Sequence, residues 1–248
     1  MELLIYIAVG FVAQMIDGAL GMAYGVSSTA FLLSTGVPAP VASASVHTAE
    51  IFTSLVSGLS HLRLGNVDRA LVKRLLIPGV VGGITGAYLL SNFDWPGLKV
   101  LIALYLMIMG VRILIKAFVA DPPRPALTGI RLVLVGFAGG LMDAIGGGGW
   151  GTIVNGTLLS NGGHARTTIG SVNLVEFFVT VAQVTTFTLF LRLENWQPIL
   201  GLILGGVIAA PFAAILLHKV NTRVLMAAVG VLIILLSLRT LWMSLLGG

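Results

Sequence analysis

Residues 142–163, "MDAIGGGGWGTIVNGTLLSNGG", place a carboxylate and four consecutive glycines inside a long apolar run. A continuous helix is a poor solution for this stretch, because each glycine in a helix interior costs about 1 kcal/mol relative to alanine. A similar stretch, "IDGALGMAYGVSSTAFLLSTG", occupies residues 16–36. The sequence therefore predicts two interrupted helices at related places in the chain.

The composition around both stretches is that of a membrane protein. Of the 248 residues, 57% are hydrophobic and only 9% are charged, and the mean hydropathy is +1.03. Soluble domains carry about 25% charged residues. Apolar stretches of about 20 residues recur along the chain, which is typical of polytopic helical membrane proteins. We predict an all-α, multi-pass protein of the cell membrane, without disulfides because the chain has no cysteine.

Eight apolar segments divide into two groups of four around a proline-containing linker, "ADPPRPALTG", at residues 120–129. We predict a first repeat at residues 1–119 and a second at 130–248. The segments are 3–33, 41–62, 71–91, 97–118, 130–160, 167–191, 197–217 and 222–246.

The two halves are copies of one another. Residues 10–50 align with 136–176 without a gap, and 13 of the 41 pairs are identical. The alignment pairs Asp17 with Asp143 and Glu50 with Glu176. Such a duplication is the usual construction of a secondary transporter, with the solute site at the interface of the repeats.

The first segment of each half is too long for one straight crossing. Thirty-one helical residues extend about 46 Å, against a hydrocarbon core of about 30 Å. One solution is a single crossing with a broken middle, which gives parallel repeats. The other is a re-entrant hairpin, which leaves three crossings per half and gives inverted repeats. The basic residues fit both; we favour inverted repeats, because opposed hairpins bring both glycine-rich tips to one site in mid-membrane.

Four acidic residues, Asp17, Glu50, Asp143 and Glu176, lie inside apolar segments. A charge at the centre of a membrane helix costs about 2.5–3.5 kcal/mol on insertion scales. Four such residues in repeat-related pairs predict a shared internal site. The alternative is structural: the two aspartates cap the helices that follow the breaks, and the two glutamates are neutral and hydrogen-bonded.

A polar stripe surrounds the first glutamate. Ser43, His47, Glu50 and Ser54 recur at helical spacing, and Asn173 and Glu176 begin the corresponding stripe in the second half. Imidazole titrates near neutral pH, so His47, Glu50 and Glu176 are predicted to carry a coupling proton. The alternative is a buried histidine that merely bonds to its neighbours.

The glycines could form an anion-binding nest, because a backbone without Cβ atoms can turn successive N–H groups toward one point. The helix that restarts near Trp150 would add its positive end. Close helix packing through G-x-x-x-G is the alternative. The predicted solute-binding residues are Asp17, Gly21, Tyr24, Gly25, Ser27, Ser28, Asp143, Gly146, Gly147, Gly148, Gly149, Trp150, Thr152, Asn155 and Asn173.

The two breaks ("MIDGALGMAYG" and "MDAIGGGGWG"), the stretch "HLRLGNVD" at 61–68 and the tandem fours of apolar segments resemble the sulfite exporter TauE/SafE family over residues 3–245. The resemblance implies a small permease for sulfite, organosulfonates or related sulfur-containing anions, driven by an ion gradient. The stretches "VHTAE" (46–50) and "VNLVE" (172–176) depart from the small residues that many members carry there. His47, Asn173 and the paired glutamates therefore look like a subgroup feature.

Two functional hypotheses follow. The first is a transporter of a small sulfur-containing anion, coupled to protons, in which loading requires neutral carboxylates. The second is a cation or metal-ion transporter that uses the same carboxylates as ligands. Metalloprotease, nucleophile-elbow, dinucleotide and Walker motifs are absent, so we expect neither an enzyme nor a nucleic-acid-binding protein. No cofactor or resident metal is expected; the partners are the solute, a proton and the bilayer, and a homo-oligomer is compatible with the sequence.

Overall fold

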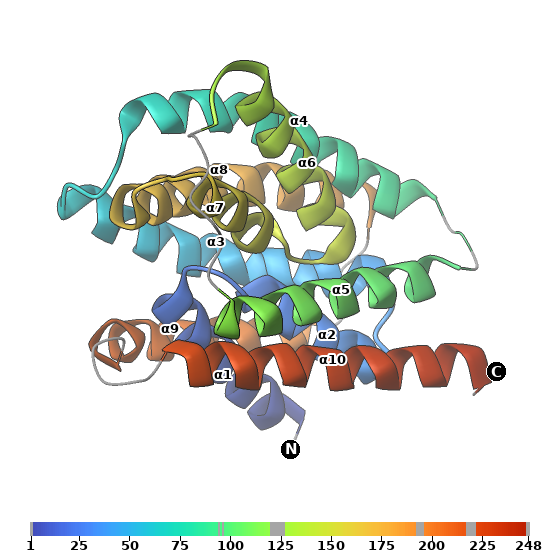
Figure 1. Ribbon diagram of the computed structural model, residues 1–248. Helices are drawn as coiled ribbons and strands as arrows, with labels where there is room; N and C mark the ends of the chain where they lie inside the picture. The colour runs from blue at the N-terminus through green and yellow to red at the C-terminus, as the bar shows by residue number, and fades with distance from the viewer. Residues whose placement is uncertain are drawn as a thin grey trace.

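The computed structural model describes residues 2–93, 95, 97–119, 127–191, 196–216 and 222–246 (Figure 1). Within these ranges the secondary structure is entirely helical. The helices are α1 (Glu2–Leu20), α2 (Tyr24–Ser34), α3 (Ala39–Arg63), α4 (Arg69–Asn92), α5 (Leu98–Phe118), α6 (Gly129–Gly146), the π-helix η1 (Gly151–Asn155), α7 (Gly156–Ser160), α8 (Ala165–Phe190), α9 (Trp196–Leu216) and α10 (Thr222–Leu246).

Both long apolar segments are interrupted. In the first half, α1 ends at Leu20 and α2 begins at Tyr24. In the second half, α6 ends at Gly146, and the chain resumes as η1, which continues directly into α7. Each of the other six predicted segments corresponds to one helix. The eight apolar runs therefore mark the helices correctly, and the glycine-rich stretches mark the interruptions.

The outer surface fits a lipid environment. In the described part of the chain, five helices are long and apolar enough to cross a membrane: α4, α5, α6, and most of α8 and α10. Large apolar side chains project outward, among them Ile77 and Phe118, whose exposed fractions are 70% and 72%. A water-soluble monomer rarely exposes apolar surface on this scale. The chain is a multi-pass helical membrane protein.

Six helices form a continuous row in which the two halves interleave. The order of packing is α6, α4, α8, α3, α9 and α1. Thus α4 of the first half lies between two helices of the second half, and α9 of the second half lies between two helices of the first. The repeat alignment pairs α1 with α6, α4 with α9 and α3 with α8. When each helix is replaced by its repeat partner, the same row is obtained, read from the other end. Whether the repeats are inverted or parallel stays a prediction.

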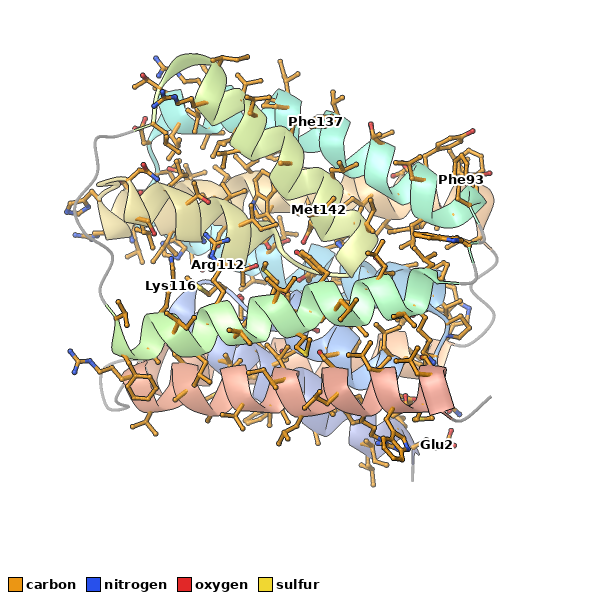
Figure 2. All side chains as sticks on the ribbon, turned by 45° about the vertical axis from the view of Figure 1, so that its right-hand side comes forward. Glu2, Phe93, Arg112, Lys116, Phe137 and Met142 are labelled. Atoms are coloured by element: carbon orange, nitrogen blue, oxygen red, sulfur yellow. The ribbon has the colours of Figure 1, made fainter. Side chains whose placement is uncertain are left out.

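Glycines allow the closest contacts in this row. A Cβ on Gly82 of α4 would lie 2.1 Å from the carbonyl oxygen of Phe137, which is labelled on α6 in Figure 2. At the equivalent contact between α9 and α1, a Cβ on Gly205 would lie 2.1 Å from the carbonyl oxygen of Ile7. Small residues at helix contacts are a common packing device in membranes, and here they hold the outer pair of helices at each end of the row.

A second layer consists of α5 and α10, which pack along one another and against α2. Arg112 and Lys116 rise from α5 toward α7 (Figure 2). The Lys116 ammonium donates to the carbonyl oxygen of Gly156 at 3.1 Å and to the Ser160 hydroxyl at 3.2 Å. This contact ties the second interrupted segment to α5. The predicted linker lies mostly outside the described residues, so the division into two repeats at 120–129 stays a prediction.

Candidate functional site

The two helix breaks touch each other at the centre of the fold. A Cβ on Gly25 would lie 2.6 Å from the Cα of Gly148. Two hydrogen bonds cross the contact reciprocally. The Thr29 hydroxyl donates to the carbonyl oxygen of Gly147, and the Asn155 amide donates to the carbonyl oxygen of Gly21 at 2.8 Å.

These two bonds correspond under the repeat, because Thr29 aligns with Asn155 and Gly21 aligns with Gly147. The breaks are therefore joined by equivalent contacts from each half. This brings the predicted glycines Gly21, Gly25, Gly147 and Gly148 together in one small region.

Each break is closed by its own aspartate. The Asp17 carboxylate accepts the backbone N–H of Tyr24, the first residue of α2, at 3.3 Å. The Asp143 carboxylate accepts the backbone N–H of Trp150, at the start of the second restarted helix, at 2.8 Å. An acidic side chain at this position satisfies an otherwise unpaired donor and favours the positive helix end. Both aspartates therefore make the capping contact that the structural alternative expects, and Asp143 also contacts His47 and Gln183.

The glycine run is both irregular and closely packed. Gly147, Gly148 and Gly149 have φ values of 67°, 141° and 157°, which side chains with a Cβ rarely adopt. A Cβ on Gly146 would lie 2.2 Å from the Tyr105 ring, and one on Gly149 would lie 2.1 Å from its hydroxyl oxygen. The Tyr105 hydroxyl donates to the carbonyl oxygen of Gly148 at 3.2 Å. Packing and backbone conformation together explain the run, and a role as an anion cradle stays a prediction.

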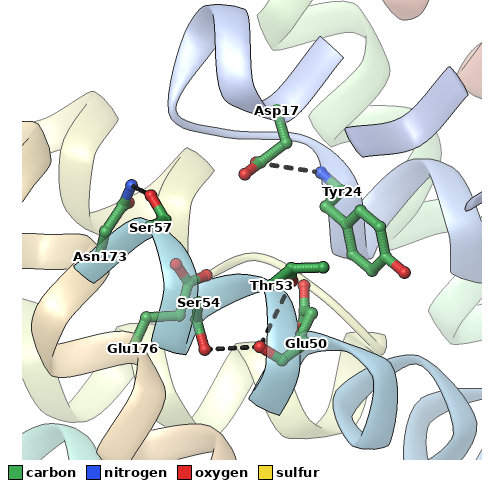
Figure 3. A pocket seen from close by; sticks show the side chains of 8 residues that line it. All are labelled: Asp17, Tyr24, Glu50, Thr53, Ser54, Ser57, Asn173 and Glu176. Carbon is green, nitrogen blue, oxygen red and sulfur yellow. Dashed lines mark hydrogen bonds between the residues drawn. The ribbon is translucent and has the colours of Figure 1, made fainter. Parts of the chain in front are cut away.

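A small polar pocket lies beside the first break, between α1, α2, α3 and α8 (Figure 3). Five predicted site residues line it, together with three hydroxyl residues. The lining residues are Asp17, Tyr24, Glu50, Thr53, Ser54, Ser57, Asn173 and Glu176. The space open to the centre of a water molecule is only about 10 Å³, which is room for about one water. Both halves of the chain contribute to this pocket, and no lysine or arginine is among its lining residues.

Glu50 is the least satisfied member of the pocket. Its side chain is buried, with an exposed fraction of 5%. Its Oε2 atom has no hydrogen-bond partner, whereas its backbone carbonyl accepts the hydroxyls of Thr53 and Ser54, as Figure 3 shows. A buried carboxylate oxygen without a hydrogen bond is costly in free energy. A proton or a hydrogen-bonding ligand at this atom would remove that cost.

Asp143 does not line this pocket; it lies in a second cluster with His47. The Nε2 atom of His47 is 3.1 Å from Asp143 Oδ2 and 3.9 Å from Glu50 Oε2. The amide of Gln183 donates to Asp143 Oδ2 at 2.8 Å. The Nδ1 atom of His47 is 2.7 Å from the carbonyl oxygen of Ser43. The expected neighbours His47 and Glu50 are therefore close, and Asp143 completes the cluster.

The other predicted residues mainly support the backbone. The Ser27 hydroxyl donates to the carbonyl oxygen of Ala23 at 2.6 Å, and the Thr152 hydroxyl donates to that of Gly149 at 3.0 Å. Trp150 is fully buried, and its indole N–H donates to the carbonyl oxygen of Val172 at 3.1 Å. Ser28 is buried with no partner for its hydroxyl. The solute-binding role of these four residues stays a prediction.

Sequence reasoning missed several residues of the site. Ser57 was detectable, because it follows Glu50 by seven residues and so lies on the same helix face. Gln183, at the equivalent position after Glu176, was placed on the polar stripe of the second half but was given no role in the site. Thr53 lies one turn after Glu50 and was detectable in the same way. Tyr105 carried no such signal, because the residues one helical turn to either side of it are apolar.

Comparison with known proteins agrees with this architecture. The sequence profile of the sulfite exporter TauE/SafE family matches residues 6–240. The probable membrane transporter protein YtnM of Bacillus subtilis (strain 168) is 40% identical over 248 residues, covering 97% of this chain and 83% of the relative. No solved structure matches.

The fold and the comparisons define a multi-pass membrane transporter rather than an enzyme. The chain belongs to the sulfite exporter TauE/SafE family. The family resemblance seen in the two breaks and in "HLRLGNVD" is thereby confirmed.

Proposed function

We propose that this transporter moves a small sulfur-containing anion, such as sulfite or an organosulfonate, together with a proton through the pocket between its two halves. The observation that carries the proposal is the position of the pocket. It lies beside the contact of the two helix breaks, it is lined from both halves, and it holds a buried carboxylate oxygen without a hydrogen-bond partner. Solute sites of duplicated transporters characteristically lie at such discontinuous helices between repeats.

The carboxylates explain why a proton accompanies the solute. Asp17, Glu50 and Glu176 together would repel an anion at short range. Protonation of Glu50, whose Oε2 has no donor, removes a negative charge from the wall and supplies a hydrogen-bond donor to an anion oxygen. Loading of proton and solute then becomes a single coupled event.

On this proposal, the pocket is closed to solute in the present conformation. The pocket has room for about one water, which is less than sulfite requires. The contact between Gly25 and Gly148 closes the adjacent region. Admission of solute requires that the two breaks separate, which would break the bonds from Thr29 and Asn155 to the carbonyl oxygens of Gly147 and Gly21.

Uptake into proteoliposomes tests the proposal. We expect sulfite or taurine to accumulate when the pH gradient is imposed and to stop accumulating when it is collapsed. Glu50→Gln should move solute without dependence on the pH gradient, because glutamine cannot exchange a proton. Glu2→Gln, which neutralises an exposed carboxylate at the start of α1, is the matched control and should behave as wild type. Unchanged pH dependence in Glu50→Gln would remove this residue from the coupling role.

A second candidate function is transport of a cation. It is favoured by the three carboxylates and the lack of lysine and arginine in the pocket lining. Against it, no group of three or more metal-ligating side chains in the described residues is arranged to hold a metal ion. The same proteoliposomes loaded with divalent metals decide the matter: movement of metals alone, without sulfite or taurine, would replace the anion proposal with this one.

A further inference from the structure

The two halves build two equivalent polar clusters around their aspartates, and the clusters differ. The alignment pairs Asp143 with Asp17 and Glu50 with Glu176. It also pairs His47 with Asn173, and Gln183 with Ser57 at the same position along α8 and α3. We call the set His47, Glu50, Asp143 and Gln183 the histidine cluster, and the set Asp17, Ser57, Asn173 and Glu176 the asparagine cluster.

The asparagine cluster is the open one. Its four residues all line the pocket, and the Asn173 amide donates to the Ser57 hydroxyl at 2.8 Å along the wall (Figure 3). In the histidine cluster, larger side chains stand at the equivalent places, and His47 and Gln183 are fully buried. Replacement of histidine and glutamine by asparagine and serine removes volume, so the pocket occurs on the side where the side chains are smaller.

The histidine cluster must contain a proton between its two main groups. The Nδ1 atom of His47 faces a backbone carbonyl, which can only accept, so Nδ1 carries a hydrogen. Nε2 then faces the carboxylate oxygen of Asp143 at 3.1 Å. Two acceptors at this distance would repel each other. Asp143 Oδ1 and Oδ2 already accept from Trp150 and Gln183, so we place this proton on His47 Nε2, which then donates to Asp143.

Glu50 connects the two clusters. Its Oε2 atom is 3.9 Å from His47 Nε2, and its side chain also lines the pocket. Movement of the Nε2 proton to Glu50 Oε2 leaves a neutral imidazole and a neutral carboxyl group. It also requires His47 Nε2 and Asp143 Oδ2 to move apart, because the two would then both be acceptors at 3.1 Å. The summed charge of His47, Glu50 and Asp143 is unchanged, but the remaining negative charge then lies on Asp143, away from the pocket. The transfer therefore makes the pocket less repulsive to an anion.

We propose that the two clusters divide the transport cycle: the histidine cluster stores the coupling proton, the asparagine cluster receives the solute, and Glu50 passes the proton between them. This inference rests on the proposed proton-coupled transport and adds which half of the site performs each step. It gives Asp143 a role in proton storage rather than the solute contact expected from the sequence.

The groups around His47 come from several helices. Asp143 approaches from α6 and Glu50 from α3 itself. Asp17 from α1, Tyr24 from α2 and Glu176 from α8 line the adjoining pocket with Glu50, and Tyr105 from α5 contacts the turn beside Asp143. Carboxylates therefore face the imidazole and the adjoining pocket from α1, α3, α6 and α8.

Two transport assays with sulfite in proteoliposomes separate the clusters. One measures accumulation driven by a pH gradient, and the other measures exchange between equal sulfite pools at equal pH. His47→Asn makes the histidine cluster resemble its counterpart; we expect it to lose gradient-driven accumulation while exchange persists. Asn173→Ala should raise the half-saturation concentration about tenfold, the effect of about 1.4 kcal/mol, while the dependence on the gradient persists. His164→Asn, at an exposed histidine before α8, is the matched control.

The protonation of His47 can be measured without any solute, so this part of the inference is tested independently of the substrate. With His61, His164 and His218 replaced by glutamine, nitrogen-15 NMR of labelled histidine in nanodiscs reports His47 alone. We expect both ring nitrogens to be protonated near neutral pH, and only one to be protonated in Asp143→Asn. Asn173→Ala should leave the signal as in wild type.

The outcomes are distinct. If wild type moves no sulfite but the NMR result is as expected, the choice of solute fails and the proton store stands. Gradient-driven accumulation by His47→Asn at the wild-type level would overturn the division of roles. A neutral His47 ring in the wild-type protein would overturn it as well.

Discussion

At the first helix break the chain turns through Gly21, Met22 and Ala23, whereas at the second it turns through Gly147, Gly148 and Gly149. Both turns end on an N–H that an aspartate accepts, but the bond is 3.3 Å long at the first break and 2.8 Å at the second. The two breaks therefore have the same architecture although their sequences differ, and the capping hydrogen bond is shorter at the second break.

The side chains around the second break also hold it more firmly than those around the first. Tyr105 and Thr29 both bond to carbonyls of the second turn, and His47 and Gln183 surround its aspartate. The first turn borders the pocket, and Ala23 holds a left-handed φ of 100° without being glycine. We infer that the second break is the more rigid one, and that the first break, which Asn155 bonds at Gly21, can rearrange beside the pocket.

The largest effect is expected from Gly148→Ala. The added Cβ would lie 2.2 Å from the carbonyl carbon of Gly25, at a φ of 141°. Overpacking and backbone strain together should cost about 4 kcal/mol of unfolding free energy and abolish transport. Thermal unfolding in detergent and sulfite uptake measure the two effects. Gly97→Ala, where the nearest atom lies 3.7 Å away, is the control; a near-normal Gly148→Ala protein would show that the two breaks need not touch.

Removing the two aspartate charges should have unequal consequences. Asp143→Asn leaves the buried His47 without its counter-charge and should lower the unfolding free energy by about 3 kcal/mol. Asp17→Asn weakens one longer capping bond at a partly exposed position and should cost about 1 kcal/mol. Parallel thermal melts compare the pair directly. Equal losses would contradict the view that the second break is the rigid one.

A smaller effect is expected at Tyr105. Tyr105→Phe keeps the ring against the glycine run but removes the hydroxyl that donates to Gly148. The loss of one such bond should cost about 1 kcal/mol, visible as a lower melting temperature. Tyr88→Phe, on an exposed part of α4, provides the matched control. If the two variants melt alike, the tyrosine contributes to the turn by packing alone.

The smallest change has the opposite sign. Ala23→Gly relieves a left-handed alanine but increases the freedom of the unfolded chain, so we expect a net stabilisation of about 0.5 kcal/mol. Ala13→Gly, inside α1, should instead destabilise by about 1 kcal/mol. Differential scanning fluorimetry of both variants checks the contrast. A lower melting temperature for Ala23→Gly would mean that the first break is not strained.

Local sequence properties were enough to predict much of this protein. Apolar runs located the helices, and the glycine clusters beside Asp17 and Asp143 located the interruptions, because hydrophobicity and backbone conformation are set by neighbouring residues. Helical spacing likewise placed His47 and Glu50 on one face of α3. These features required no knowledge of which helices meet.

The contacts between distant segments could not be read in the same way. Spacing along α3 does not reveal that Asp143 on α6 faces His47, so the sequence predicted a solute contact for this aspartate but not its contact with the histidine. The solute contact stays a prediction. Nor does spacing reveal that Tyr105 occupies the space that side chains at 146 and 149 would fill. The division of the polar residues into two clusters depends on how the helices pack, and this is where sequence reasoning was incomplete.

The interleaved row of helices has a consequence for synthesis of the protein. When the ribosome has completed α4, the face that will contact α6 has no partner, and α1 lacks α9 until most of the chain has been made. We therefore expect lipid to cover the glycine-containing faces of α1 and α4 until the later helices are inserted. If the predicted duplication holds, a separately produced first half would present these faces to another copy of itself, and we expect it to pair as a dimer of identical halves.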